Sequence, residues 1–223
     1  MTRYYAPAST GNFTVGFDLL GLALASESGA LLGDVLEVDA QKPVEQLSLT
    51  VSGRYAHQLP ADARQNVVFA CHQAFERVLE KPLPHFAMHL QKNLPVGSGL
   101  GSSACSIVVA CHALNECFGR PLDQQRLLQL MAECEGGISG SIHYDNVAPS
   151  YFGGLQLMLP HSAKISRHLP WFGHWRVVVC YPGTTLSTKA AREVMPASVE
   201  RATAVEFAGL LSRFVSALYA GDE

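Results

Sequence analysis

Short stretches in which apolar and polar residues alternate recur along the chain. A period of two is typical of a strand that buries one face. A continuous apolar run around residue 178 indicates instead a strand that is buried on both faces. The expected strands span residues 3–6, 33–39, 47–51, 86–90, 155–159 and 176–181.

Longer stretches repeat apolar residues every three or four positions, which is typical of amphipathic helices. Asn66 and Asp123 stand where helix N-caps are favoured, and Pro82 and the pair Gly136-Gly137 stand where helices stop. The expected helices span residues 67–81, 106–118, 124–135, 188–194 and 199–218. The last is too apolar to stand free in water, so we expect it to lie against another surface. Strands first and helices later favour an α+β fold.

Composition excludes several classes of function. The chain of 223 residues has 16 basic and 19 acidic residues and no basic run, which gives no electrostatic case for nucleic-acid binding. No run approaches the ~18 apolar residues of a membrane span, and residues 1–5 contain no apolar signal segment. The six cysteines form no Cys-x-x-Cys pair, so we expect buried, reduced thiols in a cytoplasmic protein rather than disulfides or a zinc site.

A glycine-rich stretch, residues 93–105, separates the strand expected at 86–90 from the helix that follows. Gly97, Gly99 and Gly101 stand at alternate positions and leave room for a group to approach the backbone. Ser102 and Ser103 stand where an N-cap is expected. Free backbone N–H groups and the positive end of a helix dipole would then point the same way. The stretch predicts a phosphate-binding loop, with a ligand-free turn as the alternative.

Several known phosphate loops do not fit this stretch. A Walker A loop needs a lysine where Ser102 stands. A dinucleotide-binding loop that began at Gly97 would need its third glycine at the same position. An oxidoreductase that binds a dinucleotide through this loop is therefore a minor alternative.

Two further stretches combine glycine with polar side chains. In residues 6–18, Asn12 and Asp18 interrupt an otherwise apolar or small run, and burying them is costly unless a partner or a local turn satisfies them. Residues 135–149 are dense in glycine and in Glu, Ser, His, Asp and Asn, which is poor material for a core. Phosphoryl transfer needs Mg²⁺ held by a hydroxyl and a carboxylate, and Ser103 and Glu135 are the residues of those types.

These stretches together carry a resemblance. From Pro95 to Ala104 the chain reads Pro-x-x-x-Gly-Leu-Gly-Ser-Ser-Ala, which resembles the ATP loop of the GHMP kinases, a family of small-molecule kinases. Residues 7–18, 143–149 and 181–192 resemble the branch of that family that phosphorylates L-homoserine. Mevalonate kinases carry a lysine-bearing motif near the N-terminus, whereas this chain has no lysine before Lys42.

The resemblance implies a ribosomal-S5-like N-terminal ATP-binding domain over residues 1–165 and the start of a ferredoxin-like C-terminal domain over 166–223. It implies ATP- and Mg²⁺-dependent phosphorylation of the side-chain hydroxyl of L-homoserine, a step toward threonine. The implied partners are L-homoserine and ATP, with no nucleic acid and no membrane. Related kinases are often homodimers.

Residue roles follow from the same resemblance. Ser103 and Glu135 would hold Mg²⁺. The residues implied to wrap the ATP phosphates are Pro95, Val96, Gly97, Ser98, Gly99, Leu100, Gly101, Ser102, Ser103, Ala104 and Cys105. Those implied to bind the substrate are Asn12, Asp18, Asp145, Asn146 and Arg192, and those implied at the catalytic centre are Asn146, Thr188 and Arg192. No residue is assigned as a general base.

One feature of that branch has no counterpart here. Its members continue further and carry a third motif, Gly-x-Ser-Gly-Ser-Gly-Pro-Thr, and nothing like it follows Leu186. The resemblance therefore implies a C-terminally truncated kinase. A catalytically impaired nucleotide-binding fragment and another small-molecule kinase of the same family remain as alternatives.

Overall fold

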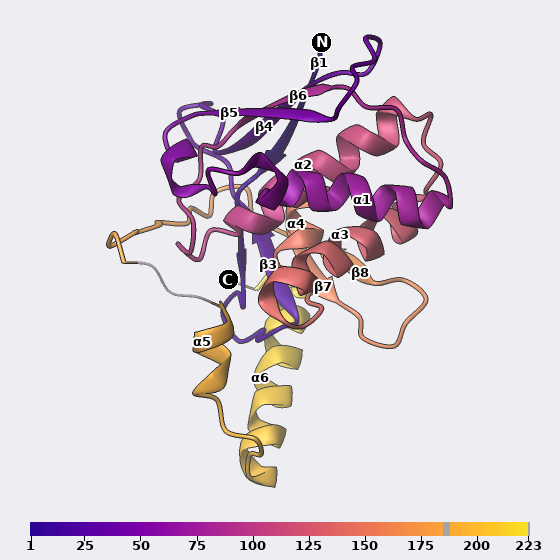
Figure 1. The fold of residues 1–223 in the computed structure, drawn as a ribbon. Coiled ribbons are helices and arrows are strands. Elements are labelled where there is room, and N and C mark those ends of the chain that lie inside the picture. The colour runs from indigo at the N-terminus through magenta and orange to yellow at the C-terminus, as the bar shows by residue number, and fades with distance from the viewer. Residues whose placement is uncertain (185–187, 223) are drawn as a thin grey trace.

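The computed structural model describes residues 1–184 and 188–222, and these form two four-stranded sheets with helices packed between and beside them (Figure 1). The first sheet has the order β1 (Thr2–Pro7), β4 (Gly33–Asp39), β6 (Ala87–Gln91) and β5 (Ser48–Ser52). Its only parallel pair among the described strands is β5 with β6. The second sheet is antiparallel and has the order β2 (Ser9–Gly11), β3 (Leu20–Ala23), β7 (Leu155–Met158) and β8 (Ser166–Leu169).

The helices follow the periodic stretches of the sequence. They are α1 (Val67–Leu79), α2 (Ser102–Cys117), α3 (Gln124–Ser139), α4 (Val147–Phe152), α5 (Thr188–Glu193) and α6 (Arg201–Ala220), with short 3₁₀ turns at η1 (Ala56–Gln58) and η2 (Ala63–Gln65). Both expected N-caps form: Asn66 Oδ1 accepts from Val68 N at 3.0 Å, and Asp123 Oδ1 accepts from Arg126 N at 2.8 Å. The α+β fold is confirmed, as are the strands expected at 3–6, 33–39, 47–51, 86–90 and 155–159, to within a few residues.

Helix α2 lies at the centre of the molecule, beneath the first sheet and beside α1, α3 and α4 (Figure 1). Every residue from Ala104 to Cys111 is buried, so the helix is covered around its whole circumference by other elements. Because α2 contacts elements on every side, the loop that leads into it is held against a fixed frame.

The strand expected over Arg176–Tyr181 is wrong. The structure has no strand there, and Val178 is 93% exposed. An apolar run becomes a strand only where a sheet edge pairs with it, and no described strand pairs with the open edge of β8. Arg176 instead forms an ion pair with Glu27.

The end expected for α3 at Gly136-Gly137 is also wrong. The helix continues to Ser139 and ends at Gly140, where φ is +88° and the N–H donates to Gly136 O at 2.9 Å. Glycine inside a helix costs only about 1 kcal/mol relative to alanine, whereas a left-handed C-terminal residue is strongly favoured as glycine. The later glycine therefore ends the helix.

The C-terminal helix is only partly covered. Phe214 and Leu218 pack against the rest of the protein, and the Phe214 ring lies 6.5 Å from the ring of Phe13. Val205 and Leu210 on the same helix are 67% and 42% exposed. Strand β8 begins at Ser166, the first residue of the expected second domain, and pairs with β7. The division at residue 165 stays a prediction.

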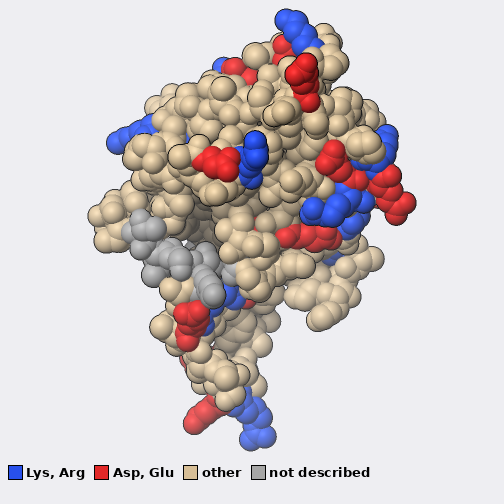
Figure 2. Space-filling view, viewed as in Figure 1, with Lys and Arg blue, Asp and Glu red and all other residues tan. Residues whose placement is uncertain are grey.

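Surface charge is mixed on the face shown in Figure 2, where basic side chains alternate with acidic ones. Among the described residues, no helix is both long and apolar enough to cross a bilayer.

One buried ion pair joins β4, the end of β6 and the central helix α2. Lys92, which directly follows β6, donates from Nζ to Asp34 Oδ2 of β4 at 2.6 Å, and both side chains are almost fully buried. The same ammonium donates to Ser102 O at 2.7 Å and to Ser106 Oγ at 2.8 Å, so all three of its protons are used. Asp34 Oδ1 accepts from Asn93 N at 2.9 Å. The pair thus holds the first turn of α2 against the first sheet.

We expect Lys92→Met to destabilise the protein by about 3–5 kcal/mol, because it leaves the Asp34 carboxylate buried without its cation. Urea unfolding followed by circular dichroism measures the change. Glu133→Gln is the matched control, since it breaks an exposed ion pair with Arg126 and should change stability little. A loss from Lys92→Met no larger than that of the control would contradict this account of the buried pair.

Candidate active site

The glycine-rich stretch forms an open loop between β6 and α2. Gly97, Gly99 and Gly101 have φ of +67°, +77° and +60°, a conformation that residues with a side chain rarely adopt. A Cβ at Gly99 would meet nothing within 4 Å, so the loop borders open space there. The alternate glycines therefore give residues 97–101 the backbone of an open loop, which we call the cradle.

The serines after the loop do not cap the helix, so the predicted cap at Ser102 and Ser103 is wrong. Gly101 is the N-cap residue and no side chain caps it. Ser102 Oγ donates to Leu94 O at 3.2 Å, and Ser103 Oγ donates to Glu135 Oε1 at 2.7 Å. Helix α2 consequently starts at Ser102 rather than at residue 106. Its first N–H groups have no partner within the helix, which favours an anion at this end.

The rest of the predicted ATP loop is anchored on the protein. Val96 N donates to Gln58 Oε1 at 2.8 Å, and Ser98 Oγ donates to Pro95 O at 2.8 Å. Ala104 and Cys105 are fully buried, and Cys105 Sγ donates to Ala6 O at 3.1 Å. Cys105 N also donates to Gly101 O at 2.8 Å, so these last two residues support the loop from inside the protein.

Ser103 and Glu135 come together as the sequence predicts for a metal site. The hydroxyl of α2 and the carboxylate of α3 are 2.7 Å apart. Burial raises the pKa of Glu135, the nearby Asp145 carboxylate raises it further, and the hydrogen bond from Ser103 opposes the shift. A carboxylate beside a hydroxyl at the N-terminal end of a helix fits Mg²⁺, which prefers such oxygen ligands together with phosphate.

The two other polar stretches, residues 6–18 and 135–149, contact the glycine-rich loop directly. Ser9 N in β2 donates to Leu100 O at 3.2 Å, and Ser9 Oγ donates to Asn146 Oδ1 at 3.1 Å. A Cβ at Gly101 would lie 2.2 Å from Ser9 Oγ and 2.9 Å from Asn146 Oδ1. Asn146 therefore lies against the end of the cradle, and only a glycine permits that contact.

Asp145, the neighbour of Asn146, is 4% exposed. Burial raises its pKa, and the Asp18 carboxylate raises it further. A Cβ at Gly11 would lie 2.2 Å from Asp145 Oδ2, so β2 packs closely on this carboxyl group.

The loop after β2 is held by a local turn, the alternative that the sequence left open. Asn12 Oδ1 accepts from Asp18 N at 2.8 Å. Asn12, Thr14 and Asp18 have φ of +55°, +51° and +57° without being glycine. Three such residues in one short loop indicate a strained segment, and strain of this kind gathers at functional sites.

Asp18 forms an ion pair with Arg192 of α5, although 174 residues separate them in the sequence. Arg192 Nη1 donates to Asp18 Oδ2 at 3.1 Å, and Nη2 donates to Oδ1. Both side chains remain partly exposed. The guanidinium also lies 5.4 Å from the centre of the Phe17 ring, and His143 Nδ1 lies 3.6 Å from Asp18 Oδ1.

Sequence reasoning assigned no role to several residues that complete this arrangement. Ser9 joins the cradle to Asn146, Phe17 packs on Arg192, and His143 joins Asp18 to Ser141, whose Oγ lies 2.5 Å from His143 Nε2. Their positions inside the two polar stretches were the available signal. Thr188 begins α5, and its side chain lies outside the described part of the structure.

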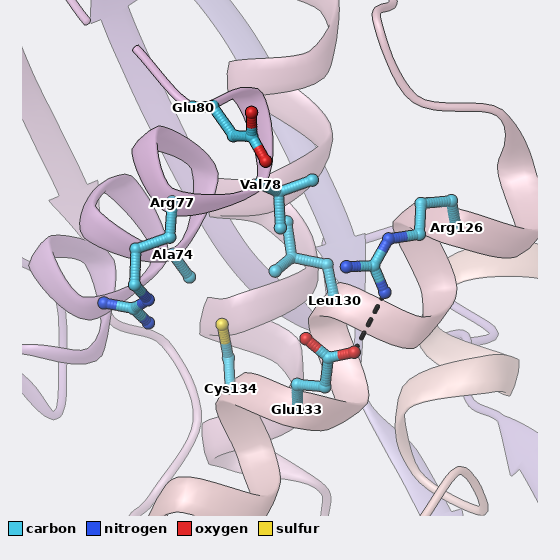
Figure 3. Close-up of a pocket in the computed structure, with 8 residues that line it drawn as sticks. All are labelled: Ala74, Arg77, Val78, Glu80, Arg126, Leu130, Glu133 and Cys134. Carbon is cyan, nitrogen blue, oxygen red and sulfur yellow. Dashed lines mark hydrogen bonds and ion pairs between the residues drawn. The ribbon is translucent and has the colours of Figure 1, made fainter. Parts of the chain in front are cut away.

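A separate pocket of about 390 Å³ opens between α1 and α3 (Figure 3). None of the predicted site residues lines it. Its lining residues are Ala74, Arg77, Val78, Glu80, Arg126, Leu130, Glu133 and Cys134.

The chain is similar to known proteins of one family. Residues 66–154 match the GHMP kinases N terminal domain. Homoserine kinase from Cytophaga hutchinsonii is 30% identical, with a TM-score of 0.78 over 99% of this chain and 68% of that one. A putative homoserine kinase from Listeria monocytogenes is 21% identical, with a TM-score of 0.69 over 99% and 70% of the two chains. Methanococcus jannaschii mevalonate kinase is 14% identical, with a TM-score of 0.58 over 76% and 56%, and like the previous match it shows the fold alone.

We expect Glu135→Gln to weaken binding of Mg²⁺ with a nucleotide by about 10-fold or more, because the variant keeps an acceptor for Ser103 Oγ and loses the charge. In the parent protein, affinity should fall as pH drops, beginning above the range of an ordinary glutamate, since the raised pKa means earlier protonation. The variant should lose that pH dependence. Isothermal titration calorimetry from mildly acidic to neutral pH measures both effects, and identical pH profiles would contradict the metal role.

Proposed function

The chain belongs to the GHMP kinase family, whose members are phosphotransferases, and we propose that it transfers the γ-phosphoryl group of ATP to the side-chain hydroxyl of L-homoserine. The 30% identity to a homoserine kinase supports this substrate. The observation that carries the proposal is the Asp18–Arg192 pair beside residues that contact the phosphate cradle. We expect such an enzyme in the cytoplasm.

The Asp18–Arg192 pair suits the two charged groups of an amino acid. A free amino acid carries an ammonium and a carboxylate, and each would replace one partner of the existing ion pair. Asp18 would accept from the ammonium, and the planar fork of Arg192 would donate two parallel hydrogen bonds to the carboxylate. Binding would exchange one partly exposed ion pair for two.

The contacts between Asn146 and the cradle support the direction of the reaction. With the charged end of homoserine at Asp18 and Arg192, its side chain would extend past Asp145 and Asn146 toward Gly101. Asn146 is well placed to orient a hydroxyl there, because its amide can accept or donate a hydrogen bond.

The nucleotide side of the site would use the backbone of residues 97–103 to bind phosphate oxygens, with Ser103 and Glu135 holding Mg²⁺. When bound, Mg²⁺ supplies charge that neutralises the phosphates. The protein's own contribution is then to align hydroxyl and phosphate and to place donors around the charge that develops. No described residue is assigned as a general base in this proposal.

Other family members phosphorylate different alcohols, so the acceptor needs a direct test. Purified chain, Mg²⁺ and ATP should release ADP and form an O-phosphorylated product with L-homoserine, and much less with L-serine, mevalonate or galactose. Coupled ADP detection and ³¹P NMR measure rate and product. A faster reaction with mevalonate or galactose would assign another GHMP kinase activity. ATP binding without transfer to any acceptor would favour the catalytically impaired alternative.

We expect Arg192→Lys to raise the KM for L-homoserine roughly 10- to 100-fold, because charge-assisted hydrogen bonds contribute about 1.5–3 kcal/mol. A lysine keeps the charge and loses the two-pronged geometry. The KM for ATP should stay within about twofold, since Arg192 lies on the acceptor side. Arg176→Lys is the matched control, because Arg176 pairs with Glu27 away from the site. Equal effects of the two variants would argue against a zwitterion-binding pair.

A further inference from the structure

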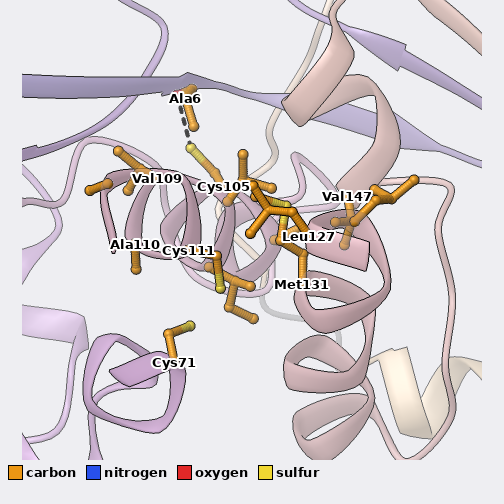
Figure 4. Close-up of a cluster of buried hydrophobic side chains, with 14 of the residues drawn as sticks. Ala6, Cys71, Cys105, Val109, Ala110, Cys111, Leu127, Met131 and Val147 are labelled. Atoms are coloured by element: carbon orange, nitrogen blue, oxygen red, sulfur yellow. Dashed lines mark hydrogen bonds between the residues drawn. The ribbon is translucent and has the colours of Figure 1, made fainter. Parts of the chain in front are cut away.

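Three cysteines from three different helices meet in the interior. Cys71 of α1, Cys111 of α2 and Cys134 of α3 bring their sulfur atoms within 4.8 Å of one another. Cys71 and Cys111 are fully buried, whereas Cys134 is partly exposed. Figure 4 shows the Cys71 and Cys111 side chains directed toward each other across the gap between their helices. Their spacing in the sequence gives no sign of this cluster.

The separation of the sulfur atoms suits a shared metal ion. A Zn–S bond of about 2.3 Å in tetrahedral geometry puts neighbouring sulfurs about 3.8 Å apart. Sulfurs already within 4.8 Å of one another would need to move by about 1 Å at most. Because three helices supply one sulfur each, small side-chain rotations suffice and the backbone frame is retained.

The ligand type selects the class of ion. The three ligand groups that lie within 4.8 Å of one another are all thiols. Thiolates prefer soft cations such as zinc, cadmium and copper(I), and they bind Mg²⁺ and Ca²⁺ poorly. The cluster is therefore chemically distinct from the hydroxyl and carboxylate of Ser103 and Glu135.

Charge favours a divalent ion over a monovalent one. Three thiolates carry three negative charges, so a divalent cation leaves a net charge of −1 and a monovalent cation leaves −2. Burying the larger charge costs more. Arg77 lines the same pocket as Cys134 and can offset the remaining charge (Figure 3). The pocket between α1 and α3 also gives an ion a route inward and leaves space for water at a fourth coordination position.

We propose that Cys71, Cys111 and Cys134 form a three-thiolate site for a divalent d¹⁰ cation, with zinc as the expected ion and a fourth coordination position open to the pocket between α1 and α3. The proposal departs from the sequence-based expectation of isolated reduced thiols. It does not depend on the kinase assignment.

Cadmium serves as a spectroscopic probe because cadmium thiolates absorb in the ultraviolet. Protein kept reduced by a phosphine and stripped of metal with a chelator should give a charge-transfer band that saturates at one Cd²⁺ per chain. Zn²⁺ should displace that band, and competition with a chromophoric chelator gives its affinity. Affinity should rise with pH, because each thiol must lose its proton to bind the ion.

Cys134→Ser should lower the affinity for Zn²⁺ by about 100-fold or more and reduce the cadmium band by about a third, since one of three thiolates is lost. Cys134 is partly exposed, so this variant should fold, which circular dichroism checks. Cys111→Ala is the second variant, and Cys180→Ser is the matched control because Cys180 is exposed elsewhere. Absence of a saturable band in the parent protein, or an unchanged band in Cys134→Ser, would overturn the proposal.

Discussion

The buried Lys92–Asp34 ion pair is the constraint on which the site depends. Two charges in a dry interior are tolerated only when their hydrogen-bonding capacity is filled, and here the partners come from β4, from the end of β6 and from the first turn of α2. Ser102 O, one of those partners, belongs to the residue that follows the cradle. The ion pair therefore ties the first sheet to the end of the cradle.

The site around this ion pair contains backbone conformations and buried carboxyl groups that are each energetically unfavourable. Asn12, Thr14 and Asp18 occupy left-handed backbone conformations, Asp145 is a buried carboxyl group, and Glu135 is held in surroundings that disfavour its charge. Each arrangement persists because packing of the two sheets and α2 determines it from several sides. Such packing fixes the positions of these side chains, which suits the proposed reaction because phosphoryl transfer depends on positioning and on charge stabilisation.

Much of the fold and the choice of motifs followed from local features that do not need a partner. Alternation predicts β6 because one of its faces is buried. Asn66 predicts the start of α1 because its side chain caps the N–H group of Val68. Alternate glycines predict the cradle, since a left-handed backbone restricts the residue type at each position. Interactions between residues that are close in the sequence depend on those residues alone, so they can be predicted from the sequence.

Contacts between distant segments were decided only by tertiary structure. Gly101 replaces the serines as the helix cap because Ser103 has a partner on α3, 32 residues away. Arg192 pairs with Asp18, which is 174 residues away in the sequence. The resemblance implied only that each of the two binds the substrate. The apolar run around Val178 stays exposed because no sheet edge receives it. The face on which a residue lies along a strand or helix is a local property, whereas the choice of which helices pack together depends on the whole core. The spacing of the three cysteines in the sequence therefore could not predict that they meet.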